Sequence, residues 1–89
     1  MNHSELQSPT PLSDLLLISR VERGISQSQA ALRLKVSNAA VSNWECGTWI
    51  PEIGRRTAIC RVYGIERTAF NHALVSTIKL RRAQRNKEK

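Results

Sequence analysis

Residues 26–47 constrain the fold more than any other part of this chain. Their sequence is SQSQAALRLKVSNAAVSNWECG, in which apolar and small residues recur with a helical period in two short stretches. Ser26 and Gln29 match a capping box, which predicts that a helix begins at Ser26. Ser37 is a good N-cap for the next helix, expected over residues 38–46. The run therefore predicts two short amphipathic helices joined by a tight turn.

The remaining sequence also predicts helices. Pro11 suits a first helical turn and Gly24 a helix end, so a first helix is expected over residues 11–23. The helix that begins at Ser26 is expected to stop near residue 34 or 35. Apolar residues recur at Ile53, Ile59, Val62 and Tyr63 and again at Phe70, Leu74, Val75 and Ile78, which predicts helices over residues 52–63 and 67–80. No strand-like alternation occurs, so the fold class is all-α, with five expected helices.

The length of 89 residues is that of one small domain. Polar residues and prolines at the start indicate a flexible N-terminal arm over residues 1–10. The helical domain is expected to span residues 11–80. A basic C-terminal tail, residues 81–89, is expected to extend from the domain as a helix or tail and to fray into solvent.

The net charge of +7 favours a polyanionic partner, but the charge is uneven. Six of the 14 basic residues lie between Lys79 and Lys89, where Glu88 is the one acidic residue. The other 78 residues carry eight basic and six acidic side chains. Charge alone is therefore a weak argument for nucleic-acid binding.

Several classes of function find no support in the composition. Cys46 and Cys60 are 14 residues apart, and without a CxxC pair or a Cys/His cluster no metal site and no cofactor are expected. No nucleophile–base set or phosphate loop indicates an enzyme. The longest apolar run, residues 15–18, is too short to span a bilayer and lacks the flanks of a signal peptide. Two thiols fit a reducing cytoplasm.

Packing within the 26–47 run favours a helix-turn-helix. Ala31 is small where two helices would cross, and Val41 and Trp44 would hold the second helix against the first. The other face of that second helix is then free to enter a major groove about 12 Å wide. It carries small and amide side chains: Ser37, Asn38, Ala39, Ser42 and Asn43.

From about residue 20 to residue 65 the chain resembles the phage Cro/CI-type (XRE) repressor family. The resemblance is carried by Gly24-Ile25-Ser26-Gln27, Val36-Ser37, Val41-Ser42-Asn43-Trp44-Glu45, Gly47, Pro51 and Gly64-Ile65. Each motif alone is weak, whereas their shared order and spacing are specific. The resemblance implies a compact, lambda-repressor-like bundle of five helices in which helices two and three form the DNA-binding unit.

The resemblance also implies roles for single residues. Base-facing positions are matched by Asn38, Ala39, Ser42 and Asn43. Positions near the DNA phosphates are matched by Gln27, Ser37, Thr48 and Trp49, and for Trp49 a subunit contact is an equal alternative. Arg20 and Glu45 match positions that in some members form a partly buried ion pair between helices one and three.

Three residues depart from the family pattern. Lys35 replaces the usual glycine of the turn, and we predict that it nevertheless adopts a positive φ. Cys46 stands where a basic phosphate contact is common, which puts one backbone contact in doubt. Arg56 stands where helix four usually has an apolar residue, and it is expected to turn outward towards DNA or a partner.

The leading hypothesis is a transcriptional regulator, a repressor rather than an activator, that binds a palindromic DNA operator as a homodimer through helix 38–46. Such a protein is expected to associate with the nucleoid. One alternative is the antitoxin of a toxin–antitoxin pair, with a toxin as partner. A second is a basic RNA-binding or membrane-surface protein that uses its C-terminal segment.

Overall fold

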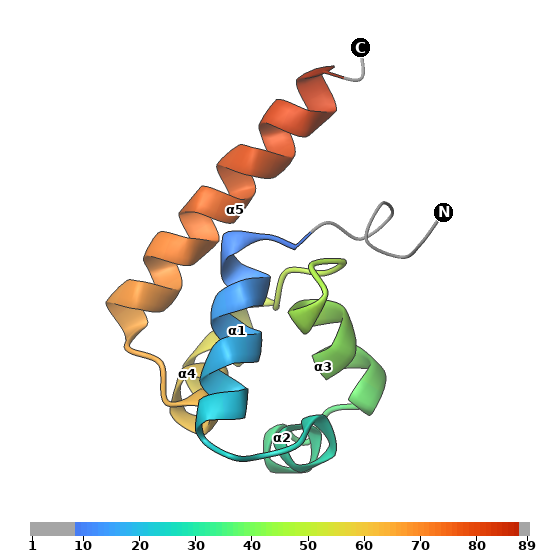
Figure 1. Ribbon diagram of the computed structural model, residues 1–89, viewed down its shortest axis with the longest axis vertical. Coiled ribbons are helices and arrows are strands. Elements are labelled where there is room, and N and C mark those ends of the chain that lie inside the picture. The colour runs from blue at the N-terminus through green and yellow to red at the C-terminus, as the bar shows by residue number, and fades with distance from the viewer. Residues whose placement is uncertain (1–8, 88–89) are drawn as a thin grey trace.

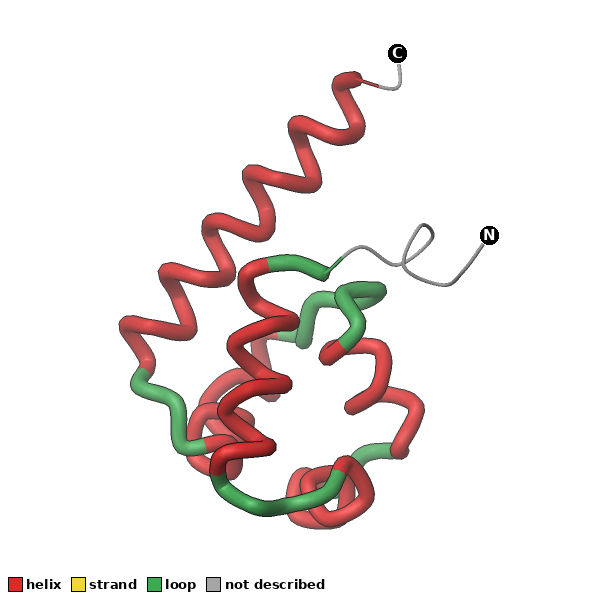
Figure 2. The backbone as a smooth tube through the Cα atoms, in the orientation of Figure 1, coloured by secondary structure: helices red, strands yellow, loops and turns green. Residues whose placement is uncertain are grey.

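The computed structural model describes residues 9–87, and these residues fold into five α-helices and one short 3₁₀ turn without a strand. The elements are α1 (Pro11–Glu22), α2 (Gln27–Leu34), α3 (Asn38–Glu45), η2 (Ile53–Arg55), α4 (Arg56–Tyr63) and α5 (Arg67–Lys87). The helix α1 lies centrally, α2 and α3 form one side, α4 lies on another, and α5 crosses the bundle and projects beyond it (Figures 1 and 2). The all-α prediction is confirmed. Of the expected arm over residues 1–10, all but Pro9 and Thr10 lie outside the described residues.

Side-chain caps begin the first three helices. The capping box predicted for α2 is confirmed: Ser26 Oγ accepts from the Gln29 amide at 3.0 Å, and Gln29 Oε1 accepts from the Ser26 amide at 2.8 Å. Ser37 Oγ accepts from the Ala40 amide at 3.1 Å at the start of α3. Thr10 and Ser13 form a second capping box, at the start of α1. Each cap satisfies amides that a helix N-terminus leaves unpaired.

The turn between α2 and α3 depends on Lys35. Its φ of 58° and ψ of 44° are left-handed, which confirms the sequence prediction. The following amide, of Val36, donates to the Ala31 carbonyl at 3.0 Å, so that the turn closes the end of α2. The chain reverses here without the glycine that such a conformation favours.

We expect Lys35→Gly to raise the free energy of unfolding by about 0.5–1 kcal/mol, because glycine adopts positive φ without a Cβ clash. Lys35 is exposed, so the change removes little packing. Urea unfolding monitored by circular dichroism would measure the difference. Lys35→Ala is the control, since alanine keeps the Cβ in the same conformation, and a glycine variant no more stable than it would contradict the interpretation.

The core lies between α1 and the other four helices. Leu16, Val41, Ile59 and Phe70 are fully buried, and each comes from a different helix. Ala31 is buried where α2 packs on α3, as its small size predicted. This packing holds α3 in place from several sides.

Thr77 joins α5 to the start of α1. Its Oγ1 accepts from the Leu12 amide at 2.9 Å and donates to the Ala73 carbonyl at 2.8 Å. Because the Leu12 amide lies in the first turn of α1, no carbonyl of that helix can accept from it. The hydroxyl of Thr77, which is almost completely buried, thereby fixes where α5 crosses α1.

Two predicted helix boundaries are wrong. The fourth helix was expected from Glu52, but residues 53–55 form a 3₁₀ turn and Ile53 is 77% exposed. Ile53 precedes Ile59 by six residues, which on an α-helix places the two about 120° apart, so one face cannot bury both. The fifth helix was expected to end near Leu80, but it continues to Lys87. Residues 81–87 lack glycine and proline, and Arg, Ala, Gln and Lys favour helices.

The predicted apolar stripe of α5 is only partly buried. Phe70 and Leu74 lie in the core, whereas Val75 is 50% and Ile78 is 41% exposed. No helix among the described residues is long and apolar enough to cross a membrane.

Candidate nucleic-acid interface

One face of α3 is open to solvent. Asn38, Ala39 and Ser42 are exposed there, and Asn43 is half-buried at its edge. Val41 and Trp44 are buried on the opposite face, because residues three apart share a side of a helix. The structure thus brings the four expected base-facing residues onto one surface.

Asn38 is held by a residue that the sequence analysis did not single out. Its Nδ2 donates to Ser28 Oγ at 3.1 Å, which links the first turns of α2 and α3. A side-chain amide carries two N–H donors and one carbonyl acceptor. After the bond to Ser28, the Oδ1 atom and one N–H of Asn38 stay free, and these are the two groups that bind N6 and N7 of adenine.

Asn43 is engaged along its own helix. Its Nδ2 donates to the Ala39 carbonyl at 2.8 Å. Its backbone carbonyl accepts from the amides of Thr48 at 3.0 Å and Trp49 at 3.1 Å, which folds the next loop back on the end of α3. Asn43 therefore places the loop after α3 and is less available than Asn38 at the surface.

Two of the four expected phosphate contacts lie at helix starts. Gln27 is the first residue of α2 and half-buried, and its Nε2 donates to Glu45 Oε1 at 3.2 Å. Ser37 is exposed, and its hydroxyl caps α3. The first amides of α2 and α3 point out of these helix ends, where an anion binds favourably.

The other two expected phosphate contacts lie in the loop after α3. Thr48 is exposed, and its Oγ1 lies 3.1 Å from Cys46 Sγ. Trp49 is 52% exposed, which leaves most of its indole free for a partner. The side chains of Cys46 and Thr48 hydrogen-bond to each other. Where the family often has a basic phosphate contact, this chain therefore has a contact within the loop.

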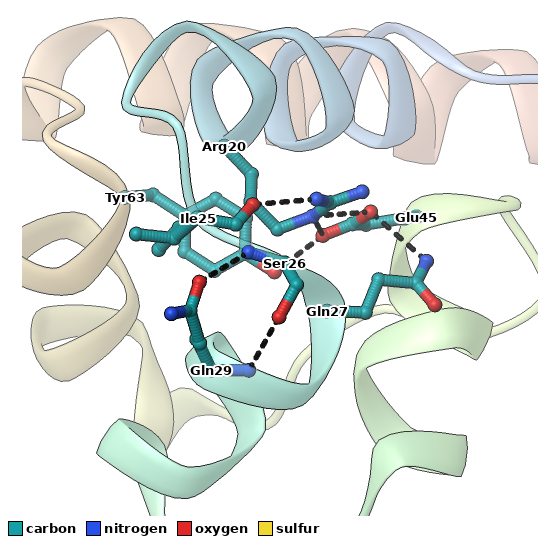
Figure 3. A network of polar contacts seen from close by, with 7 residues as sticks. All are labelled: Arg20, Ile25, Ser26, Gln27, Gln29, Glu45 and Tyr63. Carbon is teal, nitrogen blue, oxygen red and sulfur yellow. Dashed lines mark hydrogen bonds and ion pairs between the residues drawn. The ribbon is translucent and has the colours of Figure 1, made fainter.

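A buried ion pair supports α3 from behind (Figure 3). Arg20 Nε donates to both oxygens of Glu45, at 3.0 Å and 2.8 Å, and the two side chains are 10% and 2% exposed. Arg20 Nη1 also donates to the Ile25 carbonyl at 2.8 Å, and the Tyr63 hydroxyl donates to Glu45 Oε2 at 2.6 Å. With Gln27, Glu45 therefore connects α1, α2, α3 and α4.

Tyr63 was expected only as an apolar residue of the fourth helix. It lies 18 residues from Glu45 in the chain, and no local pattern signals that its hydroxyl reaches the carboxylate. Burial raises the pKa of Tyr63 well above its ordinary value of 10, and the hydrogen bond to Glu45 raises it further. The bond to Glu45 likewise raises the pKa of Arg20.

The raised pKa of Tyr63 predicts a loss of stability in alkaline solution. The folded protein holds the phenol proton more tightly than the unfolded chain does, so this contribution is complete below pH 10 and falls as the pH rises further. Tyr63→Phe is expected to cost about 1–3 kcal/mol at pH 7, because the hydrogen bond to a carboxylate is lost.

Urea unfolding at pH 8 and pH 11 would test this dependence. The wild-type protein should lose more free energy of unfolding between the two pH values than Tyr63→Phe does. The variant also serves as the control for the other groups that titrate in this range, such as Cys60. Equal losses would show that Tyr63 does not couple folding to pH.

The expectation for Arg56 is wrong. Instead of turning outward, its Nε donates to the Pro51 carbonyl at 3.1 Å, and the side chain is half-buried. An arginine at this place can bond a carbonyl of the preceding loop, whereas an apolar side chain could not. Arg56 therefore fastens the loop between α3 and α4.

Comparison with known proteins identifies one match. Residues 16–70, which contain all of α2, α3 and α4, match the model of a helix-turn-helix family. Searches of curated proteins and of solved structures find no match.

Proposed function

The chain belongs to the Cro/CI-type (XRE) family of helix-turn-helix proteins and is a DNA-binding transcriptional regulator, and from this we propose that it is a repressor that binds a palindromic operator as a homodimer. One observation carries the proposal: α3 presents an exposed polar face while Glu45, at its other end, is anchored to three neighbouring helices. A helix fixed in this way can enter a major groove without rearranging.

In the proposed complex, base recognition is centred on Asn38. Its free amide edge pairs with adenine while Ser28 holds the side chain. Ala39 contacts a thymine methyl group, and Ser42 and Asn43 contact neighbouring base edges. Gln27, Ser37, Thr48 and Trp49 lie along the phosphates and set the position of α3. Gln27 does so from the N-terminus of α2, with its side chain held by Glu45.

Homodimer formation follows from the small size of the reading surface. Four side chains of one subunit contact few base pairs, and two copies related by a two-fold axis double the site. The α5 helix offers Val75 and Ile78, which are half-exposed apolar side chains, to a second copy. A dimer bound at a promoter blocks polymerase, which makes repression the simplest outcome.

Selection of bound sites from random DNA tests the proposal. We expect a palindromic consensus whose half-sites lie about 34 Å apart, or one helical turn. Sedimentation equilibrium of the bound complex should show two chains per site. Enrichment of a single, non-repeated half-site would contradict the dimer, and the absence of any consensus would contradict operator recognition.

A further inference from the structure

The C-terminal half of α5 is joined to the loop that leaves α3. Arg81 Nη2 donates to the Gly47 carbonyl, and the Arg81 side chain is half-buried by the contact. Gly47 follows the C-cap of α3, and its φ of 87° turns the chain into the loop that carries Thr48 and Trp49. Arg81 therefore lies beside the loop that adjoins the recognition surface, and Figure 1 shows the last turns of α5 extending past the bundle from there.

The side chains of this segment are strongly basic. Five basic and no acidic residues occur between Lys79 and Lys87. Arg85 follows Arg81 by four residues, so the two share one face of α5, one turn apart. Lys79 lies about 160° around the helix from Arg81, on the side away from Gly47. Arg85 therefore lies on the same face of α5 as Arg81, one turn further along the helix and beyond the contact with Gly47.

Charge indicates which partner this face fits. Pairing the distal part of α5 with the same part of a second copy would bring arginines close to arginines, which like-charge repulsion disfavours. A duplex carries one negative charge per about 1.7 Å of its axis and attracts such a face. The distal part of α5 is thus better matched to DNA than to another copy of the chain.

We propose that Arg85 binds the sugar–phosphate backbone of the operator beside the loop of Thr48 and Trp49, with Arg81 as the positioning residue that fixes α5 there. The proposal rests on the proposed binding of an operator. It adds a phosphate contact from outside the helix-turn-helix, at a place where Cys46 supplies no positive charge. The bond to Gly47 holds the helix in position before DNA arrives, so little ordering is needed on binding.

The experiment compares Arg85→Gln with Lys79→Gln in the full chain. Both changes remove one positive charge from an exposed residue of α5, on different faces. Dissociation constants for a duplex carrying the selected operator are measured by fluorescence anisotropy between 50 and 200 mM salt. The slope of log K against log salt should fall by about 0.9 per subunit for Arg85→Gln. For a dimer, raising the salt from 50 to 200 mM should therefore weaken DNA binding by Arg85→Gln about 12-fold less than it weakens binding by the wild type.

Lys79→Gln should keep the wild-type slope, and both variants should select the same consensus. Equal decreases in slope would overturn the proposal, because they would report net charge alone. An unchanged slope for Arg85→Gln would overturn it too, and if sedimentation then showed weaker self-association, the face would belong to a subunit contact. If no consensus exists, operator recognition fails, yet the same slopes measured on random-sequence duplex still decide whether Arg85 contacts phosphate.

Discussion

Glu45→Gln is expected to lower the free energy of unfolding by about 3–5 kcal/mol, the largest stability effect that we predict. The change leaves the Arg20 guanidinium buried without its counter-charge, since the Arg20 side chain is only 10% exposed. Glutamine also cannot accept from Arg20, Gln27 and Tyr63 as a carboxylate does. Urea unfolding at pH 7 would measure the loss, and thermal unfolding should show a fall of about 4–8 °C for each kcal/mol.

Glu52→Gln provides a matched control for this experiment. Glu52 pairs with Arg55 at 4.0 Å, but these side chains are 79% and 42% exposed, so the same substitution should cost less than about 1 kcal/mol. A double variant, Arg20→Met with Glu45→Leu, should be more stable than Glu45→Leu alone, since it leaves no unpaired charge. Similar losses of unfolding free energy for Glu45→Gln and Glu52→Gln would show that the buried pair contributes no more to stability than the exposed one.

Asn38→Ala is expected to weaken operator binding by about 1–3 kcal/mol at each half-site and to relax the preference at one base pair. The reason is that alanine removes both groups of the adenine-pairing edge. Competition binding with operators altered at single positions would measure the loss and assign the base pair. Asn38 is exposed, so folding should be unaffected.

Ser28→Ala distinguishes the role of Ser28 in holding the Asn38 side chain from the role of Asn38 in binding the base. It removes the 3.1 Å contact with Asn38 Nδ2 but leaves the reading edge intact. We therefore expect a smaller loss at the same base pair, and no further loss when Ser28→Ala is added to Asn38→Ala. A uniform loss across all DNA sequences for Asn38→Ala would instead place Asn38 at a phosphate.

Much of the local structure could be predicted because its causes lie within a few residues of each other. The caps at Ser26 and Ser37 bond amides three residues ahead, and such patterns are visible in the sequence. The left-handed turn at Lys35 was predicted for another reason: the motifs on both sides of it match the family, whose turn has a glycine at this position. The Arg20–Glu45 pair came from the family resemblance, and the structure contains it.

The wrong predictions concern residues whose position depends on tertiary contacts. Ile53 was counted among the apolar residues of the fourth helix, but it lies in a 3₁₀ turn before that helix and its side chain is exposed. Arg56 was expected to face outward, but a carbonyl of the loop lies within its reach. Neither outcome can be read from the residue type alone, because both depend on the path that the chain takes around Pro51.

The sequence by itself determined the all-α fold, the helix-turn-helix and the residues that α3 exposes, since helical period, caps and small residues are local properties of the chain. Tertiary structure alone decided that Tyr63 reaches Glu45, that Ser28 holds Asn38 and that Arg81 ties α5 to Gly47. These contacts join residues 10 to 34 positions apart. They exist because packing of the core brings helix ends together, and such proximity leaves no periodic signal in a sequence.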